Sequence, residues 1–215
     1  MNLKEKLFKK IVDNKEVIGI IGLGYVGLPL AVNFAEAGIK TIGFDKNSNK
    51  VDRINKGNNY IEDIRDALLK EVVDSIALSA TSDFSRLKEC DALLICVPTP
   101  LDRFKKPDMS YIKSACTDIG KYMKPGSFIS LESTTYPTTT EDFMLPIIER
   151  ISGLTQGIDF WLAYSPEPVD PGNKAFHTRN TPKVLGAMTS DGLELGMAIY
   201  KKAIDKIHPV SSPRI

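Results

Sequence analysis

The chain has 215 residues, of which 42% are hydrophobic and 26% are charged, and its formal net charge at pH 7 is +1. This composition is that of a globular protein with enough apolar residues for a substantial core. The balanced charge excludes the clustered basic excess of a typical nucleic-acid-binding domain, and no apolar run approaches the roughly 20 residues that a membrane span needs.

Cysteine and histidine are too scattered for a disulfide framework or a metal site. Cys90, Cys96 and Cys116 form no CxxC pair, which is typical of proteins in a reducing cytoplasm. His177 and His208 lie far apart, with no acidic cluster beside either. Lysines interrupt the apolar residues of the N-terminus, so no signal peptide is expected there. We therefore expect a cytoplasmic protein without a metal, and none of the cysteines is a convincing nucleophile.

Short apolar runs alternate with segments of helical spacing, after an amphipathic helix predicted within residues 1–16. In chain order the further predicted elements are a strand at Val17–Ile21, a helix at 25–37, a strand at Lys40–Phe44, helices at 46–56 and 61–73, strands at 76–79 and 91–97, a helix at 111–122, a strand at Ser127–Leu131, a helix at 139–151, strands at Phe160–Tyr164 and 181–187, a helix at 191–204 and a strand at Ile207–Val210.

This alternation indicates an α/β fold with a doubly wound, mostly parallel sheet and helices on both of its faces. Residues 17–210 are expected to form that domain, with residues 1–16 as a helix before it. Ser211-Ser212-Pro213 is typical of a helix N-cap followed by proline in the first turn. Residues 211–215 are therefore expected to begin a truncated linker helix to a further domain.

A glycine-rich loop follows the first predicted strand. Gly22, Gly24 and Gly27 form a GxGxxG motif with Tyr25 and Val26 between the last two glycines. The first glycine permits a tight turn, the second lets the backbone approach a pyrophosphate, and the third lets the helix pack closely on the strand. The free amides of the loop and the positive end of the helix would stabilise phosphate charge. The motif predicts a Rossmann-type dinucleotide site.

Asp45 follows the second predicted strand, where a carboxylate can accept hydrogen bonds from both hydroxyls of the adenosine ribose. A 2′-phosphate would be repelled there, which favours NAD over NADP. The alternative is a structural glycine turn beside a solvated aspartate.

Polar side chains follow three later strands at the edge where ligands bind in open α/β sheets. Thr99 lies after the strand at 91–97, and its hydroxyl could meet cofactor phosphate or ribose. Thr134 lies after Ser127–Leu131, and Glu167 lies after Phe160–Tyr164, where a carboxylate could orient or activate a water. Hydroxyls that only cap strand ends and a surface glutamate are the structural alternatives.

Several motifs also occur in the order and spacing of one known family. They are GLGYVGLP at 22–29, Asp45, CVPTP at 96–100, ESTTYP at 132–137 and SPE at 165–167. On these motifs the chain resembles the UDP-glucose/GDP-mannose dehydrogenase family over nearly its whole length from Val17 onward. YIED at 60–63, ESTTYP and DPGN at 170–173 resemble the branch of the family that oxidises UDP-N-acetylhexosamines.

The resemblance implies a two-step oxidation of the sugar 6-hydroxyl to a carboxylate with two molecules of NAD, for polysaccharide precursor synthesis. It implies that the glycine loop, Asp45, Lys50, Thr99 and Thr134 contact NAD. Thr134 and Glu167 would also lie near the reacting carbon, with Glu167 holding or activating the hydrolytic water.

The family's active-site lysine, asparagine and cysteine are expected beyond Ile215, so this chain is expected to be inactive alone. The resemblance also implies that the full-length enzyme is a homodimer. Three positions depart from the family pattern: Lys50 and Pro168 stand where arginine is usual, and Thr138 stands where glycine is usual. A UDP-glucose 6-dehydrogenase, a hydroxy-acid dehydrogenase and a non-catalytic nucleotide-binding module are the alternatives.

Overall fold

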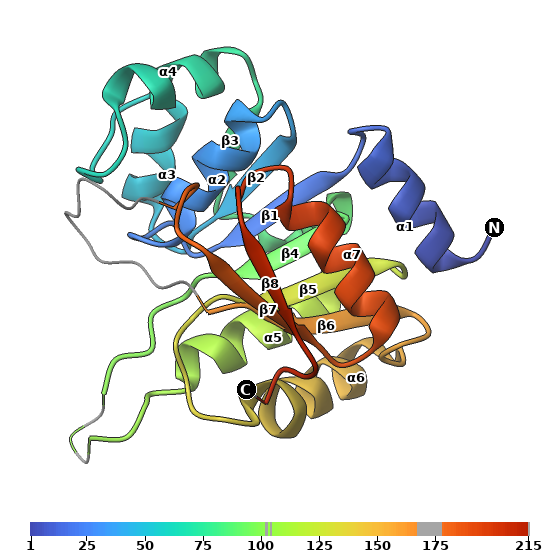
Figure 1. The fold of residues 1–215 in the computed structure, drawn as a ribbon. Helices are drawn as coiled ribbons and strands as arrows, with labels where there is room; N and C mark the ends of the chain where they lie inside the picture. The colour runs from blue at the N-terminus through green and yellow to red at the C-terminus, as the bar shows by residue number, and fades with distance from the viewer. Residues whose placement is uncertain (102, 104, 167–177, 215) are drawn as a thin grey trace.

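A central sheet of eight strands organises the fold, in the order β3-β2-β1-β4-β5-β6-β7-β8 (Figure 1). The computed structural model describes residues 1–101, 103, 105–166 and 178–214. Every neighbouring pair of strands is parallel except β6 and β7, so the predicted mostly parallel, doubly wound sheet is confirmed. The strands are β1 (Val17–Ile21), β2 (Lys40–Phe44), β3 (Leu78–Thr81), β4 (Ala92–Ile95), β5 (Ser127–Leu131), β6 (Phe160–Tyr164), β7 (Lys183–Ala187) and β8 (Ile207–Val210).

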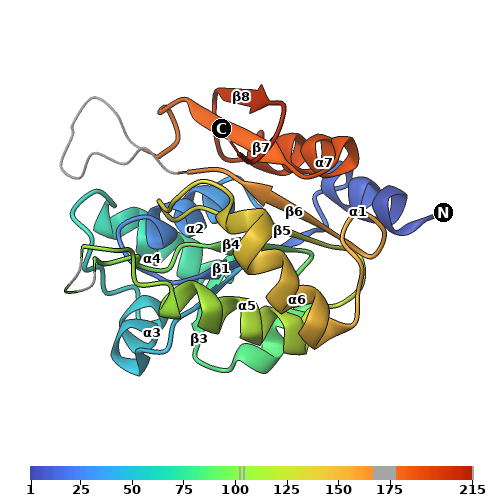
Figure 2. The same cartoon turned by 90° about the horizontal axis from the view of Figure 1, so that it is seen from below.

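Helices cover both faces of the sheet. Figure 2 shows α5 and α6 on one side of the strands and α2 and α7 on the other. Successive residues of a strand face opposite layers, so Leu94 of β4 packs with α2 and α7 while Leu93 packs with α5 and α6. The helices are α1 (Leu3–Val12), α2 (Gly27–Glu36), α3 (Ser48–Asn55), α4 (Asp66–Asp74), α5 (Ser110–Tyr122), α6 (Leu145–Ser152) and α7 (Ser190–Tyr200), with a 3₁₀ helix η1 (Phe84–Glu89) and a π-helix η2 (Thr139–Met144).

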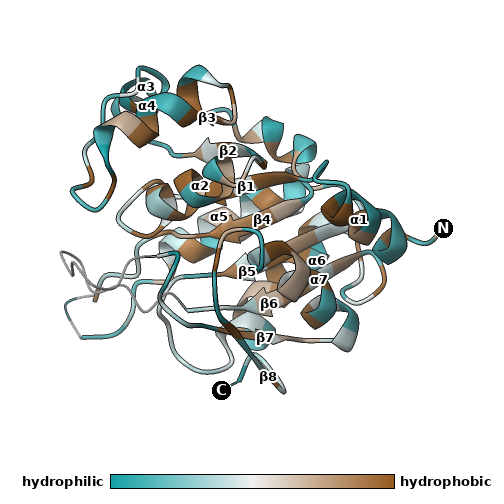
Figure 3. Cartoon of the chain, turned by 45° about the horizontal axis from the view of Figure 1, so that its top comes forward, coloured by the Kyte–Doolittle hydropathy of each residue, from teal (hydrophilic) through white to brown (hydrophobic). Residues whose placement is uncertain are grey.

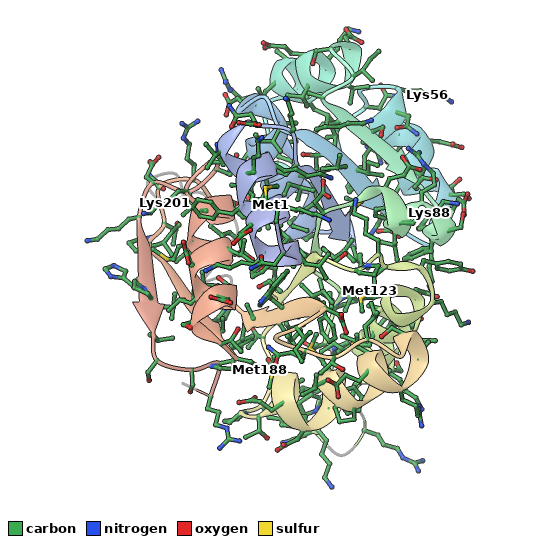
Figure 4. All side chains as sticks on the ribbon, turned by 90° about the vertical axis from the view of Figure 1, so that its right-hand side faces the viewer. Met1, Lys56, Lys88, Met123, Met188 and Lys201 are labelled. Carbon is green, nitrogen blue, oxygen red and sulfur yellow. The ribbon has the colours of Figure 1, made fainter. Side chains whose placement is uncertain are left out.

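Hydropathy follows these layers. The strands are predominantly hydrophobic, whereas the outer faces of the helices carry most of the hydrophilic residues (Figure 3). Charged side chains such as Lys56, Lys88 and Lys201 lie at the periphery in Figure 4, and all three are exposed.

The structure changes the bounds of several predicted elements. The helix expected at 191–204 ends at Tyr200, and the strands expected at 91–97 and 181–187 are Ala92–Ile95 and Lys183–Ala187. The helix expected at 61–73 occupies Asp66–Asp74 instead, because residues 62–64 form turns. The short strand expected at 76–79 is Leu78–Thr81, and the helix expected at 139–151 begins with the π-helical η2. Residues 213 and 214 form a turn, and residue 215 lies outside the described residues, so the expected linker helix stays a prediction.

Candidate functional site

The carboxyl ends of five parallel strands form one level edge. Ile21 of β1 pairs with Phe44 of β2 and Ile95 of β4; Leu131 of β5 pairs with Ile95 and with Tyr164 of β6. The glycine loop, Asp45 and the three later motifs follow these residues in the sequence. The sheet therefore brings the motifs to a common edge.

The three glycines of the loop stand in three different surroundings. Gly22 has φ +95°, and a Cβ there would lie 2.7 Å from the backbone oxygen of Cys96. A Cβ on Gly27, the first residue of α2, would lie 1.8 Å from the backbone oxygen of Gly22, which follows β1. Only glycine therefore lets α2 begin this close to the end of the strand. A Cβ on Gly24 would meet no protein atom within 4 Å. The first and third glycines thus serve the turn and the packing, whereas Gly24 opens space beside the backbone.

The amino end of α2 points out of this loop and has no capping side chain. Val26 is the N-cap and makes no side-chain cap hydrogen bond, and the first turn holds no acidic residue. The helix dipole therefore leaves partial positive charge at the loop that no side chain of the helix neutralises. Tyr25, between Gly24 and Val26, is 58% exposed.

Asp45 lies directly against the glycine loop. Its Oδ2 accepts a hydrogen bond from the backbone N–H of Leu23 at 3.0 Å, and its Oδ1 accepts one from Asn47 at 2.9 Å. The ammonium of Lys50 lies 3.5 Å from Oδ2. The side chain of Asp45 is only 13% exposed, so these bonds fix the carboxylate beside the loop. The sequence analysis expects both Asp45 and Lys50 to contact NAD, and the structure places their charged groups side by side.

Tyr60 adds a residue that sequence spacing did not assign to the site. Its hydroxyl donates a hydrogen bond to the carbonyl of Leu23 at 2.6 Å, and the Arg53 guanidinium lies 5.1 Å from the centre of its ring. Burial, with the negative charge of Asp45 nearby, raises the pKa of the Tyr60 hydroxyl well above its ordinary value. The sequence indicated Tyr60 only as part of the YIED motif, because nothing in its spacing shows that it reaches the loop.

The ends of β4 and β5 are joined by two hydroxyl groups. Thr99 donates from Oγ1 to the carbonyl oxygen of Thr134 at 2.7 Å, and Ser133 donates from Oγ to the carbonyl of Val97 at 2.6 Å. Thr134 is exposed and Thr99 is half-buried. The two predicted threonines therefore lie together at the edge of the sheet.

The chain after Thr134 turns through a strained residue into η2. Thr138 has φ +69° in the left-handed region, where a β-branched side chain is strained. This backbone conformation explains why glycine is usual at the position in the resembled family. The Thr135 and Thr139 hydroxyls lie 3.0 Å apart inside the same turn. Glu167 and Pro168 lie outside the described residues, so the role predicted for Glu167 stays a prediction.

A buried ion pair lies behind the ends of β5 and β6, and sequence reasoning missed it. The Lys183 ammonium lies 2.7 Å from Oε2 of Glu132, and both side chains are almost fully buried. Tyr200 donates its hydroxyl hydrogen to Oε1 of Glu132, and Lys183 donates to the carbonyl of Ser165 at 3.0 Å. Burial, together with the Glu132 charge, raises the pKa of Tyr200 well above its ordinary value. A lysine that opens the apolar run KVLGA was the available signal.

The remaining candidates are structural. Cys90, Cys96 and Cys116 are buried and form no disulfide. Burial raises the pKa of Cys90 to about 12 and that of Cys116 to about 12. Such thiols are poor nucleophiles. Within the described part of the chain, no cluster of three or more His, Cys, Asp or Glu side chains could hold a metal, and no helix is long and apolar enough to cross a bilayer.

A glycine loop between β1 and α2, an acidic residue after β2 and a 3-2-1-4-5-6 strand order define a dinucleotide-binding α/β domain. The chain belongs to the UDP-glucose/GDP-mannose dehydrogenase family: residues 16–204 match the NAD-binding domain of that family. This match confirms the resemblance inferred from the sequence motifs.

Curated relatives agree with this assignment. The chain is 36% identical over 199 residues to UDP-N-acetyl-D-glucosamine 6-dehydrogenase of Pseudomonas aeruginosa, covering 92% of the chain and 46% of that protein. It is 35% identical over 188 residues to UDP-N-acetyl-D-mannosamine dehydrogenase of Pyrococcus horikoshii, covering 87% of the chain and 44% of that protein. The chain thus spans about half the length of the curated relatives it matches.

Solved structures show the same likeness. An NDP-N-acetyl-D-galactosaminuronic acid dehydrogenase from Methanosarcina mazei has a TM-score of 0.90 at 33% identity, covering 99% of this chain and 47% of that one. A ternary complex of GDP-mannose dehydrogenase from Pseudomonas aeruginosa has a TM-score of 0.84 at 30% identity, covering 92% of this chain and 46% of that one.

Proposed function

We propose that the chain binds NAD across the carboxyl edge of its sheet, as the cofactor-binding part of an enzyme that oxidises the 6-hydroxyl of a UDP-N-acetylhexosamine. The observation that carries the proposal is the open space at Gly24, directly beside the fixed carboxylate of Asp45. A side chain at Gly24 would fill the approach of a pyrophosphate, and none is present. The residues at this edge therefore fit the cofactor.

The adenosine half of NAD would lie over β1 and β2. The amino end of α2, which has no capping side chain, would stabilise the negative charge of the pyrophosphate. Asp45 keeps its bonds from Leu23 and Asn47 and has lone pairs left to accept the two ribose hydroxyls. The Lys50 ammonium lies 3.5 Å from Oδ2 of Asp45 and leaves the carboxylate beside the glycine loop.

The nicotinamide half would lie over β4 and β5, the second mononucleotide half of the sheet. The Thr99 hydroxyl already donates its hydrogen to Thr134, so toward a ligand it can only accept. It therefore suits a ribose hydroxyl or a carboxamide N–H rather than a phosphate. When bound, NAD supplies the hydride acceptor, while Thr134 and Glu167 are the residues proposed to face the reacting carbon.

The substrate class rests on the relatives and on the YIED and ESTTYP motifs. UDP-N-acetylglucosamine is the first substrate to test, with UDP-glucose as the alternative. The oxidation is proposed to take place in the cytoplasm, with which buried free thiols agree, and in a homodimer of the full-length protein. Sugar-dependent formation of NADH by the full encoded protein tests the substrate, and light scattering tests the dimer.

Cofactor binding is tested on the chain itself by isothermal titration with NAD and NADP. We expect tighter binding of NAD, since a 2′-phosphate would face Asp45. Asp45→Ala should lower the affinity for NAD by about 10- to 100-fold, as expected for loss of hydrogen bonds to a charged acceptor. It should also reduce the difference between the affinities for NAD and NADP. Equal affinity of the native chain for the two cofactors would contradict the role of Asp45.

A further inference from the structure

Three buried polar side chains from distant parts of the chain meet behind the edge that carries Thr99 and Thr134. Glu132 follows β5, Lys183 opens β7, and Tyr200 ends α7, and each is at most 1% exposed. Lys183 lies 2.7 Å from Glu132, and its ammonium lies 5.4 Å from the centre of the Tyr200 ring. The three side chains form one network, which we call the Lys183 network.

The network also holds the end of β6. The antiparallel ladder between β6 and β7 pairs only Ala163 and Tyr164 of β6 with residues of β7. Beyond that ladder, Ser165 donates from Oγ to the carbonyl of Val184 at 2.7 Å, while its own carbonyl accepts from Lys183 at 3.0 Å. Side-chain bonds thus fix Ser165 where the backbone ladder stops.

Stability alone does not account for charges in this place. Moving an ion pair out of water is costly, and apolar side chains of similar volume are often as stable or more so. Lys183 balances the charge of Glu132 at 2.7 Å, without a hydrogen bond to Oε2. Direction comes from the hydrogen bonds around this pair: Lys183 donates to the Ser165 carbonyl, and Tyr200 donates to Oε1 of Glu132. Here the fixed partners are Glu132 and Ser165, the first residues after β5 and β6.

A short path connects Glu132 to the proposed cofactor edge. Its backbone N–H donates to the carbonyl of Ile95 in β4 at 2.9 Å. The next two residues are Ser133, which bonds to Val97, and Thr134, which accepts from Thr99. The segment 132–134 is therefore held from β4 on one side and from Lys183 and Tyr200 on the other.

We propose that Lys183 is a positioning residue for the nicotinamide half of the NAD site, acting through Glu132 and Ser165. The inference rests on the proposed function. The inference distinguishes the two halves of NAD. The adenosine half would lie over β1 and β2, whose loop and Asp45 have no bond to the Lys183 network among the described residues. Loss of Lys183 should therefore weaken binding of NAD and leave binding of ADP unchanged.

The test compares Lys183→Met, Glu132→Gln and the double variant with the native chain, using titration with NAD and with ADP. Lys183→Met removes the charge from an unbranched side chain of similar length, and the double variant leaves no unpaired charge if the single variants do not fold. Lys10→Met is the matched control, because it breaks a bond to Asp91 at the opposite edge of the sheet.

We expect NAD affinity to fall at least about fivefold in the network variants, as after loss of one hydrogen bond to a ligand, with ADP affinity within about twofold of native. Lys10→Met should keep the native ratio of the two affinities. Parallel losses for NAD and ADP, or an unchanged NAD affinity, would overturn the inference while leaving the proposed function in place. A native chain that binds neither ligand would overturn both.

Discussion

Thr138→Gly should stabilise the chain, because it relieves the left-handed backbone of a β-branched residue. Thr138 has φ +69°, precedes η2, and makes no side-chain capping bond to it. Backbone strain of this kind costs about 1–3 kcal/mol, and the greater freedom of glycine in the unfolded chain offsets roughly 0.5–1 kcal/mol of the gain. A net gain of about 1 kcal/mol corresponds to a rise in Tm of about 2–4 °C for a domain of this size.

The assay is thermal and urea unfolding of the native chain, Thr138→Gly, Thr138→Ala and Thr155→Gly. Thr155 is exposed and outside the left-handed region, so glycine there should lower the free energy of unfolding by about 0.5–1 kcal/mol. Thr138→Ala keeps a Cβ on the strained backbone, so it should raise the free energy of unfolding by less than Thr138→Gly does. If glycine at 138 has the same effect as glycine at 155, strain at Thr138 is not the cause, and the reasoning is refuted.

Three further predictions concern the glycine loop and one buried carboxylate. Gly24→Val should fold, since its Cβ meets no protein atom, but NAD should no longer raise its Tm; a rise equal to that of the native chain would place the cofactor elsewhere. Gly27→Ala should lower the free energy of unfolding by about 4 kcal/mol or more, because its Cβ would lie 1.8 Å from a backbone oxygen. Gly24→Ala should change it by no more than about 1 kcal/mol, because its Cβ would meet no protein atom. Urea unfolding measures both values, and equal losses would contradict the packing argument. Glu16 is 1% exposed, and burial raises the pKa of its carboxyl group. Its own backbone N–H and the charge of Lys202 oppose this rise, and the charge of Asp91 adds to it. The stability that the neutral carboxyl group contributes is present at low pH and is lost as the pH rises through the folded-state pKa. Glu16→Gln should therefore raise the free energy of unfolding by roughly 1–3 kcal/mol at pH 8 and by less at pH 4. The same rise at both pH values would exclude titration of Glu16 as the cause.

The sequence predicted the sheet and the position of the motifs at its carboxyl edge, because their signals are local. Val17–Ile21 and the run at 91–97 are continuous apolar segments, and both contain central strands. The glycine loop needs only its own spacing and the flanking strand and helix. Asp45, Thr99 and Thr134 were placed correctly at strand ends because parallel strands share one carboxyl edge.

The Lys183 network could not be predicted in the same way. Its members are the residue after β5, the first residue of β7 and the last residue of α7, and nothing in their spacing indicates that they meet. The antiparallel direction of β7 also lacks a local signal, because an apolar run has the same pattern in either direction. The helix predicted at 61–73 was wrong at its start for a different reason. The Asn59 side chain accepts a hydrogen bond from the backbone N–H of Ile61 and donates one to its carbonyl, which holds a turn where apolar spacing indicated a helix.

Helix α1 packs into the core of the domain although it precedes the residues that match the family's NAD-binding domain. The family match begins at residue 16, yet Leu7 and Ile11 of α1 are buried in the same core as α2 and α7. Burial alone would raise the pKa of Asp91, but hydrogen bonds from Lys10 of α1 and from Lys124 outweigh it and hold the pKa of this carboxyl below its ordinary value.

Burying two such apolar side chains contributes about 3–6 kcal/mol at most, a large share of the roughly 5–15 kcal/mol that keeps a domain folded. A chain cut at residue 16, where the match to the NAD-binding domain begins, would lose this contribution and leave Asp91 with one fewer cation. The residues that carry the cofactor motifs therefore depend for their stability on a helix that lies outside the matched segment.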